Sequence, residues 1–325
     1  MELLFLGTSA GAPTRTRNVS ACALRPTAGK GWYLVDCGEA TQHRLLGSPL
    51  TLLTLEGICL THVHGDHIFG LPGLLSSAQM AGRTAPLSLL APTGVREYVE
   101  TALRCSATYL GYPLDWISIG PDSPALTRKG LSIETVALSH RVPSYAYCFA
   151  EAAHARNLDK DKLHAAGIPS GPHLARLRNG ERITLADGRS IAAEDFLLPS
   201  RRQRRIIIAG DNDSPELLAA ATCHTDVLVH EATFTQAIAD KVGPVPQHSS
   251  AAQIATFAES VGLPNLVLTH FSGRYNDQTE LPGSISEIGT EAAAHYRGRI
   301  FLARDYACYT LDADGILHDS TVQNP

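Results

Sequence analysis

The feature that most constrains this chain is the sequence THVHGDH at residues 61–67. Four side chains of types that commonly bind metal ions lie within six positions of one another: His62, His64, Asp66 and His67. Gly65 allows a sharp turn among them, and the apolar run 57–60 before them predicts a short buried strand. The four side chains are therefore expected on a loop that leaves a strand end. The alternative interpretation is a histidine-rich surface loop.

The chemistry of this loop favours a divalent metal ion used for hydrolysis. Imidazole nitrogens suit zinc, and a carboxylate beside three imidazoles suits such a centre. His62 and His64 alternate along the chain, so their rings can converge on one ion, while Asp66 and His67 can reach a second. The loop therefore predicts part of a metal centre, and other segments must supply the remaining ligands.

The composition predicts a folded chain with a large core. Of the 325 residues, 44% are hydrophobic and 18% are charged, which excludes a disordered chain and fits one large α/β domain or two small ones. The formal net charge of −5 argues against a simple nucleic-acid binder, because phosphate contacts need lysine and arginine. A local basic patch is still compatible with this net charge.

Cysteine usage and the N-terminus indicate the compartment. The seven cysteines are scattered and include no C-x-x-C pair, which fits a reduced cytosol better than a disulfide framework. The N-terminus has no basic region and predicts a first strand, not a signal peptide. No apolar run is long enough to cross a membrane. We expect a soluble cytoplasmic protein.

Short apolar runs alternate with helical segments along most of the chain. The predicted strands cover residues 2–6, 31–35, 57–60, 87–90, 133–138, 145–150, 205–209, 227–229, 266–269 and 299–303. The predicted helices cover residues 41–46, 70–80, 93–107, 215–221, 249–261 and 284–296. This alternation predicts a layered α/β architecture.

One segment, residues 151–204, departs from that pattern. It is polar, is punctuated by glycine and proline, and includes or adjoins several arginines: Arg176, Arg178, Arg182, Arg201, Arg202, Arg204 and Arg205. We interpret it as an insertion that projects from the main domain. A solvated linker with a short hairpin is the alternative interpretation of the same composition.

Three further ionisable residues follow predicted strands, and they are His140, Asp211 and His270. In open α/β sheets, sites form outside the carboxyl ends of strands. Together with the loop at 61–67, these residues give seven ligands, enough for two zinc ions with room for water. A lone histidine after a strand is more often a packed or surface residue, so the hypothesis depends on the ordered set.

This ordered set resembles the signature of the metallo-β-lactamase superfamily, in which H-x-H-x-D-H precedes histidine, aspartate and histidine ligands. Further motifs, spread over nearly the whole chain, resemble ribonuclease Z, a family of tRNA 3′-processing endonucleases, in its short bacterial form. They are residues 1–11 with 13–18 (PTRTRN), residues 34–42, Gly171 with Pro172, residues 230–233 (HEAT) and residues 270–275 (HFSGRY). Two positions depart from the family's pattern: Ser250 replaces a threonine and Arg15 a lysine. The hydroxyl and the charge are retained.

The resemblance implies an α/β fold of the metallo-β-lactamase type, an αββα sandwich. It implies one catalytic domain over residues 1–325, with a flexible substrate-binding arm inserted at 151–204. The implied activity is that of a hydrolase, a zinc-dependent endoribonuclease that cleaves the 3′ trailer from precursor tRNA. Metal-hydroxide attack on a phosphodiester would leave a 3′-hydroxyl on the tRNA.

The resemblance also assigns metal ligands. The first zinc ion would be held by His62, His64 and His140, and the second by Asp66, His67 and His270, with Asp211 as the bridge. Manganese or iron(II) could occupy the same ligands. Asp66 could in addition accept a proton from the attacking water.

The remaining roles also come from the resemblance. His248 would be the general acid for the leaving 3′-oxygen, Glu231 would orient it, and His230 could be only a structural neighbour. Substrate contacts would come from Arg274, Arg15, Arg17 and Asn18, and from Gly171 and Pro172 in the arm. The arm would grip the tRNA body and, in a homodimer, serve the active site of the partner subunit.

Two other functions fit parts of the sequence. The same metal centre could act on a small phosphodiester, a sulfate ester, a thioester or a lactam. A non-enzymatic RNA-binding relative could keep the fold, but such relatives usually lose ligands, and none is missing here. The Gly171–Pro172 element, Glu231 and His248 together favour RNA as the substrate.

Overall fold

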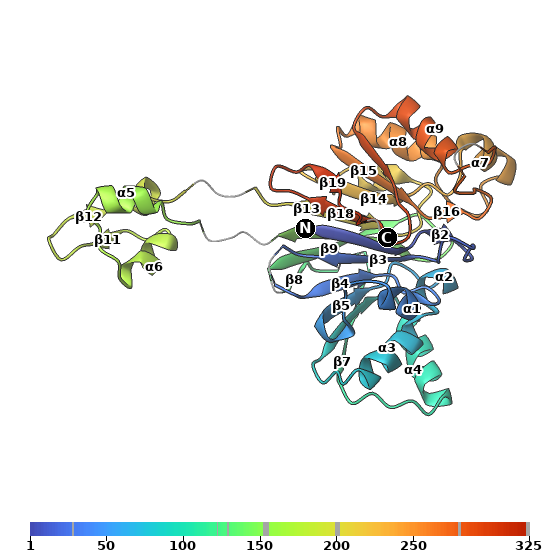
Figure 1. The fold of residues 1–325 in the computed structure, drawn as a ribbon, viewed down its shortest axis with the longest axis horizontal. Helices are drawn as coiled ribbons and strands as arrows, with labels where there is room; N and C mark the ends of the chain where they lie inside the picture. Colours follow the sequence, from blue (N-terminus) through green and yellow to red (C-terminus); the bar gives the residue numbers. More distant parts are fainter. Residues whose placement is uncertain are drawn as a thin grey trace. The chain divides into compact units, whose positions relative to one another are not determined.

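The computed structural model describes residues 1–27, 29–121, 123–128, 130–151, 156–198, 202–278 and 281–322. The chain forms two compact units (Figure 1). The first, here the main unit, comprises Met1–Ala150 and Arg204–Pro325. The second, here the inserted unit, comprises Glu151–Gln203. The predicted insertion, 151–204, ends one residue later than this unit.

The main unit is built on two large sheets. The eight-stranded sheet has the order β19 (Leu317–Asp319), β18 (Cys308–Leu311), β1 (Glu2–Gly7), β3 (Ala21–Arg25), β4 (Trp32–Val35), β5 (Leu55–Cys59), β6 (Leu87–Ala91) and β7 (Leu114–Ser118). The seven-stranded sheet has the order β17 (Arg299–Leu302), β15 (Asn265–Thr269), β14 (Val227–Glu231), β13 (Arg205–Ala209), β10 (Ser144–Glu151), β9 (Leu131–Leu138) and β8 (Leu126–Arg128).

Each sheet contains a run of parallel strands. Strands β4 to β7 are parallel in the first sheet, and β13, β14, β15 and β17 are parallel in the second. Parallel strands place their carboxyl ends at one edge of a sheet, where open α/β proteins form their sites. The loops that follow β4, β5, β13 and β15 therefore reach the same region.

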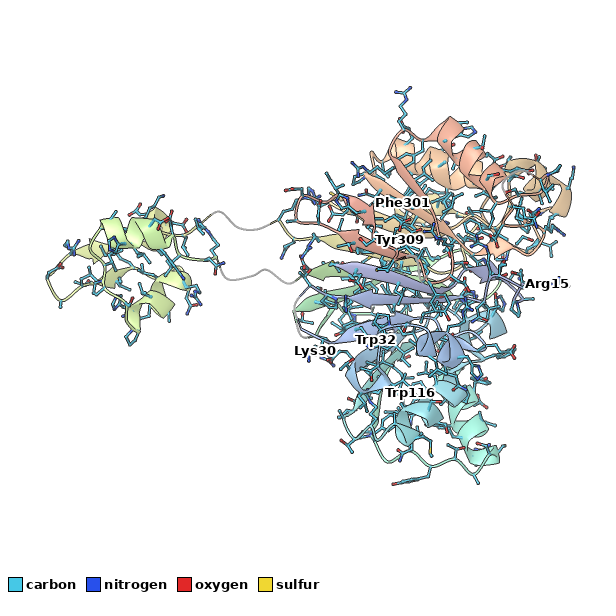
Figure 2. All side chains as sticks on the ribbon, viewed as in Figure 1. Arg15, Lys30, Trp32, Trp116, Phe301 and Tyr309 are labelled. Atoms are coloured by element: carbon cyan, nitrogen blue, oxygen red, sulfur yellow. The ribbon has the colours of Figure 1, made fainter. Side chains whose placement is uncertain are left out.

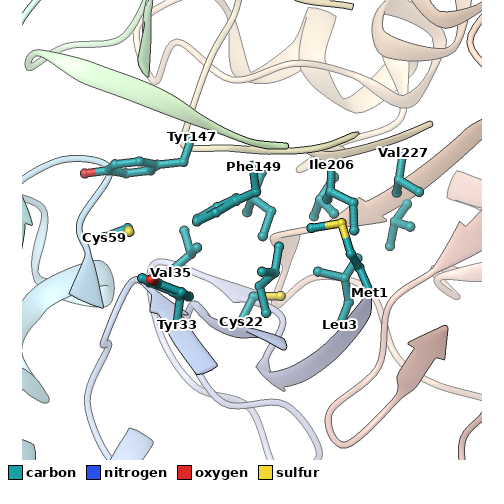
Figure 3. Packing of buried hydrophobic residues seen from close by; sticks show 14 of the residues in the cluster. Met1, Leu3, Cys22, Tyr33, Val35, Cys59, Tyr147, Phe149, Ile206 and Val227 are labelled. Carbon is teal, nitrogen blue, oxygen red and sulfur yellow. The ribbon is translucent and has the colours of Figure 1, made fainter. Parts of the chain in front are cut away.

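The two sheets pack face to face around an apolar core (Figure 3). Leu3 and Phe5 of β1 point into this core, as do Tyr147 and Phe149 of β10. Alternate residues of the same strands point the other way; Leu4, for example, packs toward the helices. Both faces of each sheet are thus buried, which explains why these strands are apolar at nearly every position.

Helices cover the outer face of each sheet. The eight-stranded sheet packs against α1 (Thr41–Leu46), α3 (Leu71–Met80) and α4 (Val95–Cys105). The seven-stranded sheet packs against α8 (Ala251–Ser260) and α9 (Ser286–His295). The order of layers is helix, sheet, sheet, helix (Figure 1), and the predicted αββα sandwich is confirmed.

The predicted elements need some corrections. Residues 215–221, predicted as a helix, contain only a short 3-10 helix, Pro215–Leu218. Strands β3, β7, β18 and β19 were not predicted, and neither was α7 (Gln236–Val242). Alanine-rich β3 has little intrinsic strand preference, and β7 is a partly exposed edge strand. Packing within the sheet therefore overrides weak local signals at these segments.

Two small elements shape the region at the strand ends. A short helix, α2 (Gly65–Ile68), starts directly after His64. Strand β2 (Ser9–Ala10) pairs with β16 (Phe271–Ser272), which follows His270. The N-terminal loop is thereby fixed beside the residues predicted as ligands. In the part of the chain that the structure describes, no helix has the length and apolar character needed to span a bilayer.

The inserted unit has its own small core. It contains α5 (Lys160–Ala165), α6 (His173–Arg178) and a hairpin of β11 (Ile183–Thr184) and β12 (Ser190–Ile191). The buried apolar side chains are Leu158, Leu163, Ile168, Leu177, Ile183, Ile191, Ala193 and Leu197. Residues 156–198 are therefore a folded unit and not a solvated linker. Arg201 lies outside the described residues.

Candidate active site

Four predicted ligands form one group at the ends of β5, β9 and β13. They are His62, His64, His140 and Asp211, and one ligand atom of each lies within 4.8 Å of those of the others. His64 Nδ1 and His140 Nε2 face each other at 3.1 Å. His62 Nε2 lies 3.6 Å from Asp211 Oδ2. All four donors thus point to one place.

The other three predicted ligands form a second group. Asp66, His67 and His270 also have their ligand atoms within 4.8 Å of one another. His67 Nε2 and His270 Nε2 are 3.4 Å apart, and each lies 3.4–3.5 Å from Asp66 Oδ2. The structure therefore brings these three predicted side chains together.

Asp211 lies between the two groups. Its Oδ2 faces His62 and His140, at 3.6 and 3.7 Å. Its Oδ1 faces His67 and His270, at 3.5 and 3.4 Å. One carboxylate thus offers one oxygen to each group, as a bridge between two cations would require.

Hydrogen bonds among these side chains leave one buried donor atom unused, which a metal ion could bind. His62 Nε2 is buried and has no hydrogen-bond partner in the described structure, which is costly unless something else occupies its lone pair. Burial lowers the pKa of His62 and His64, and neighbouring imidazoles lower it further. Neutral imidazoles beside carboxylates are the donors that zinc prefers. The residues present therefore fit a pair of divalent ions.

A second set of contacts orients the histidine rings. His67 Nδ1 lies 2.7 Å from Asp36 Oδ2, His140 Nδ1 lies 2.9 Å from the Gln247 carbonyl, and His270 Nδ1 lies 3.0 Å from Thr233 Oγ1. In each ring, the Nδ1 contact leaves Nε2 to face the ligand group. Such outer contacts fix the tautomer and direction of a ligand.

Asp36 is not among the predicted site residues, but it contacts one of them, His67. It follows β4, and besides His67 it accepts hydrogen bonds from the Thr61 amide (2.8 Å) and the Thr61 hydroxyl (2.9 Å). It therefore fixes the start of the histidine loop. A carboxylate directly after an apolar strand was the available signal, the same one that identified Asp211.

The backbone near the ligands is unusually constrained. Asp36 and His270 have φ values of 60° and 56°, a region that residues other than glycine rarely adopt. A Cβ on Gly38 would lie 2.3 Å from the Asp66 carbonyl oxygen, so only glycine permits this approach. Strain of this kind concentrates at functional sites.

His248 and Glu231 form a pair beside the ligand groups. His248 Nδ1 lies 3.0 Å from both carboxylate oxygens of Glu231, which leaves Nε2 as the ring nitrogen for proton transfer. Burial alone would lower the pKa of His248, but the Glu231 carboxylate outweighs it and raises that pKa. Glu231 Oε1 in turn accepts a hydrogen bond from the backbone amide of Asn212 at 2.8 Å. Buried Asn212 was not identified from the sequence.

The neighbours of this pair have structural contacts. His230 is fully buried, with Nδ1 2.8 Å from the Glu231 carbonyl and Nε2 3.1 Å from the side-chain nitrogen Nδ2 of Asn212. Ser250 begins α8 as an N-cap and forms a capping box with Gln253. The hydroxyl that replaces the family's threonine therefore caps the helix that follows His248.

An open cleft of about 460 Å³ gives access to these groups. It is lined by Gly11, Ala12, Pro13, Val19, Glu39, His64, Gly65, Asp66, Phe69, Arg141, Asp211, His248 and His270. A slightly larger cavity of about 520 Å³ lies along α4 and β7 and contains none of the predicted ligands. The chemistry of the lining therefore selects the first cleft as the site.

The N-terminal loop contacts the predicted ligand Asp66 through its backbone: the Gly11 amide donates to Asp66 Oδ2 at 2.8 Å. Arg17, predicted to contact substrate, is buried and uses its guanidinium within the protein, on Asp277 (2.5 Å) and the Ala303 carbonyl (2.7 Å). Asn18 Nδ2 likewise donates to the Glu39 carbonyl at 2.8 Å. Both residues hold the loop in place.

The other predicted substrate residues are accessible. Arg15 is exposed at the tip of the N-terminal loop (Figure 2). Arg274 is exposed, with its guanidinium 5.6 Å from the centre of the Phe234 ring, and Phe234 in turn packs against His248. Gly171 and Pro172 lie at the start of α6 in the inserted unit.

The fold and the donor set define the class of protein, a hydrolase of the metallo-β-lactamase superfamily. The sequence pattern of that superfamily matches residues 15–140. The chain is 50% identical to ribonuclease Z of Marinobacter nauticus over 98% of both proteins. It is 42% identical to ribonuclease BN of Proteus mirabilis, covering 89% of this chain and 95% of that relative.

A solved structure is similar as well. Human tRNase Z, short form, matches with a TM-score of 0.65 and 25% identity, over 96% of this chain and 100% of the human one. The chain belongs to the ribonuclease Z family, and the predicted family is confirmed.

Proposed function

We propose that this protein is a zinc-dependent endoribonuclease that removes the 3′ trailer from precursor tRNA and leaves a 3′-hydroxyl on the tRNA. One observation carries the proposal: Asp211 turns one carboxylate oxygen toward each group of proposed ligands, and both groups border an open cleft that is also lined by His248, the partner of Glu231. A phosphodiester in this cleft would meet cation sites and a proton donor together.

The proposed division of ligands follows the two groups. His62, His64 and His140 would hold one zinc ion, and Asp66, His67 and His270 the other, with Asp211 shared. Two such ions, when bound, supply a water nucleophile of lowered pKa and stabilise the charge that develops on the phosphoryl oxygens. Manganese or iron(II) would suit the same donors less specifically.

The protein's own groups would move the protons. The leaving 3′-oxygen of ribose is a poor leaving group unless it is protonated, and His248 is the proposed acid. Glu231 supports this role because its carboxylate holds Nδ1 and favours the charged imidazole. Asp66 would accept a proton from the attacking water through the carboxylate that also receives the Gly11 amide.

Substrate binding would be shared between both units. Arg274 and Arg15 are exposed and would contact phosphates, where a guanidinium can form paired hydrogen bonds. Arg17 and Asn18 would act on the acceptor end by holding the N-terminal loop. The inserted unit would grip the tRNA body around Gly171 and Pro172. In a homodimer, the inserted unit of one subunit would hold the tRNA that is cut at the active site of the other.

The direct test is to incubate purified protein with a 3′-extended precursor tRNA, with and without a chelator, and to map the cut. We expect one cut at the 3′ end of the tRNA body, loss of cutting with chelator and recovery with added zinc. The Asp66→Ala variant should not cut. Intact precursor with the zinc-loaded wild type would refute the proposal, and a small phosphodiester assayed in parallel would show whether another diester is the substrate.

A further inference from the structure

An exposed aromatic residue, Phe69, stands at the mouth of the cleft. It follows α2, which carries Asp66 and His67, and it lines the cleft together with both ligand groups. Its side chain is 60% exposed, although apolar surface is normally placed where it can be covered. One exposed phenylalanine is ordinary on a protein surface, but this one borders the reacting region.

The Phe69 ring is held in place on two sides. A Cβ on Gly65 would lie 2.2 Å from Phe69 Cε2, so the ring lies directly against the Gly65 backbone. Its other neighbour is Tyr98 of α4, with ring centres 6.1 Å apart and planes tilted by 40°. An aromatic ring that is exposed yet fixed loses little conformational entropy when a partner stacks on it.

A positive side chain lies in the same cleft. Arg141 follows the ligand His140, is exposed, and lines the cleft with His64 and Phe69. An aromatic face and a guanidinium in one cleft are the combination with which proteins bind single-stranded nucleic acid: the base stacks on the ring, and the charge binds the phosphate.

We propose that Phe69 stacks on the base of a nucleotide that flanks the scissile phosphate, and that Arg141 binds the neighbouring phosphate. This inference rests on the proposed function, because it requires RNA in the cleft. It makes Phe69 a residue that selects for an unpaired base at the cut and Arg141 a residue that positions the backbone. Any base can stack on the ring, so Phe69 would select for an unpaired nucleotide and not for a particular base.

The test uses the intact protein and three precursor tRNAs: one unmodified, one abasic at the last retained nucleotide and one abasic at the first trailer nucleotide. We expect Phe69→Leu to lower kcat/KM roughly 5- to 100-fold on the unmodified RNA, and Phe69→Trp to retain most activity. On one of the two abasic RNAs, the wild type should fall by the same factor and Phe69→Leu should add nothing. Tyr109→Leu, an exposed aromatic outside the cleft lining, is the matched control.

Arg141 has a different expected signature. Arg141→Gln should weaken cleavage of all three RNAs by a similar factor and reduce the slope of log(kcat/KM) against log[salt] by roughly one. Arg297→Gln, which removes an exposed charge elsewhere, should leave that slope unchanged. An unaltered salt slope in Arg141→Gln would overturn the phosphate contact.

The outcomes separate the two levels of the proposal. A wild type that cuts no precursor tRNA overturns the proposed function and this inference with it. A wild type that cuts, combined with a Phe69→Leu loss that is absent or is equally large on both abasic RNAs, overturns the stacking role alone. The second pattern would also mean that Phe69 acts through folding or assembly, since such effects do not depend on the base.

Discussion

The two units of this chain differ in how they hold their functional groups. In the main unit, the side chains proposed to react are buried or lie in a cleft, and other residues fix them; His67, only 2% exposed, is held by Asp36. In the inserted unit, the small core is apolar, and most of the described charged residues apart from buried Glu151 are exposed, such as Arg176 with a 60% exposed side chain. Chemistry at one phosphorus atom requires fixed geometry, whereas a grip on many phosphates requires only nearby charge.

The inserted unit carries only a small net positive charge. The inserted unit contains nine lysines and arginines against seven aspartates and glutamates, a net +2, while the whole chain carries −5. Several of the arginines are paired with acids of the same unit, for example Arg176 with Glu181 at 2.9 Å. The proposed grip is therefore a local one, with modest strength and strong salt dependence.

The largest effect should come from the residue that both ligand groups share. Asp211→Ala removes a carboxylate oxygen from each group, so we expect loss of bound metal and a fall in precursor cleavage of roughly 10³-fold or more. Metal analysis and single-turnover kinetics measure the two effects. Asp213→Ala, in the same loop but outside the groups, should bind metal normally; full metal content in Asp211→Ala would rule out a shared ligand.

Removing the proposed acid should separate chemistry from metal binding. We expect His248→Ala to keep its metal and to slow the chemical step roughly 10²- to 10⁴-fold, the range of general acid catalysis. His43→Ala is the control, because His43 is exposed on α1. Unchanged turnover in His248→Ala would exclude it as the acid.

Deleting the inserted unit tests the comparison most directly. Strands β10 and β13 are antiparallel neighbours, with Ala150 opposite Arg205, so a two-residue Asn-Gly turn can replace the residues between Glu151 and Arg204. We expect metal content and small-diester hydrolysis to persist, and precursor cleavage to fall by roughly 10²-fold through weaker binding. An equal loss on both substrates would mean that the unit supports the fold instead of the RNA.

The same deletion can test the predicted homodimer. A chain without the inserted unit and an Asp66→Ala chain should each fail to cut precursor tRNA efficiently. If subunits exchange inserted units, refolding the two together should restore part of the activity, because one intact site then has a unit from its partner. If mixed dimers form but no activity returns, the inserted unit of one subunit does not act at the active site of the other.

The sequence singled out the proposed ligands because metal chemistry restricts residue types. Few residues other than histidine and aspartate can replace His62 or Asp211 at a zinc site, so their order along the chain carries information. Asp36 carries only the weaker signal of a carboxylate after an apolar strand. Asn212 and Phe69 carry none, since an amide in a loop or a phenylalanine after a short helix is common. Their roles follow from what lies opposite them in space, and this depends on the packing of distant segments.

The same reasoning explains the errors in the fold. The apolar strands with two buried faces, such as β13, were predicted because burial on both sides requires apolar residues throughout. Strand β3 is held by its two neighbours in the sheet, and the 3-10 turn at Pro215–Leu218 has too few residues to show a helical period. Arg17 was predicted to contact the substrate. In the structure it is buried and pairs with Asp277, which is 260 positions away along the chain, so no local sequence signal indicates this partner.

The smallest expected effect concerns the partner of the acid. Glu231→Gln keeps the shape of the side chain but removes the charge that favours the protonated imidazole of His248. Since the carboxylate raises the pKa of His248, its loss should lower that pKa. As the pH rises, His248 then loses its proton, and with it the ability to act as an acid, at a lower pH than in the wild type. We expect turnover to fall by roughly tenfold above neutrality, less at acidic pH, with the alkaline limb of kcat moved to lower pH. Glu134→Gln, an exposed carboxylate on β9, should leave that limb in place, and an unmoved limb in Glu231→Gln would show that Glu231 only positions the ring.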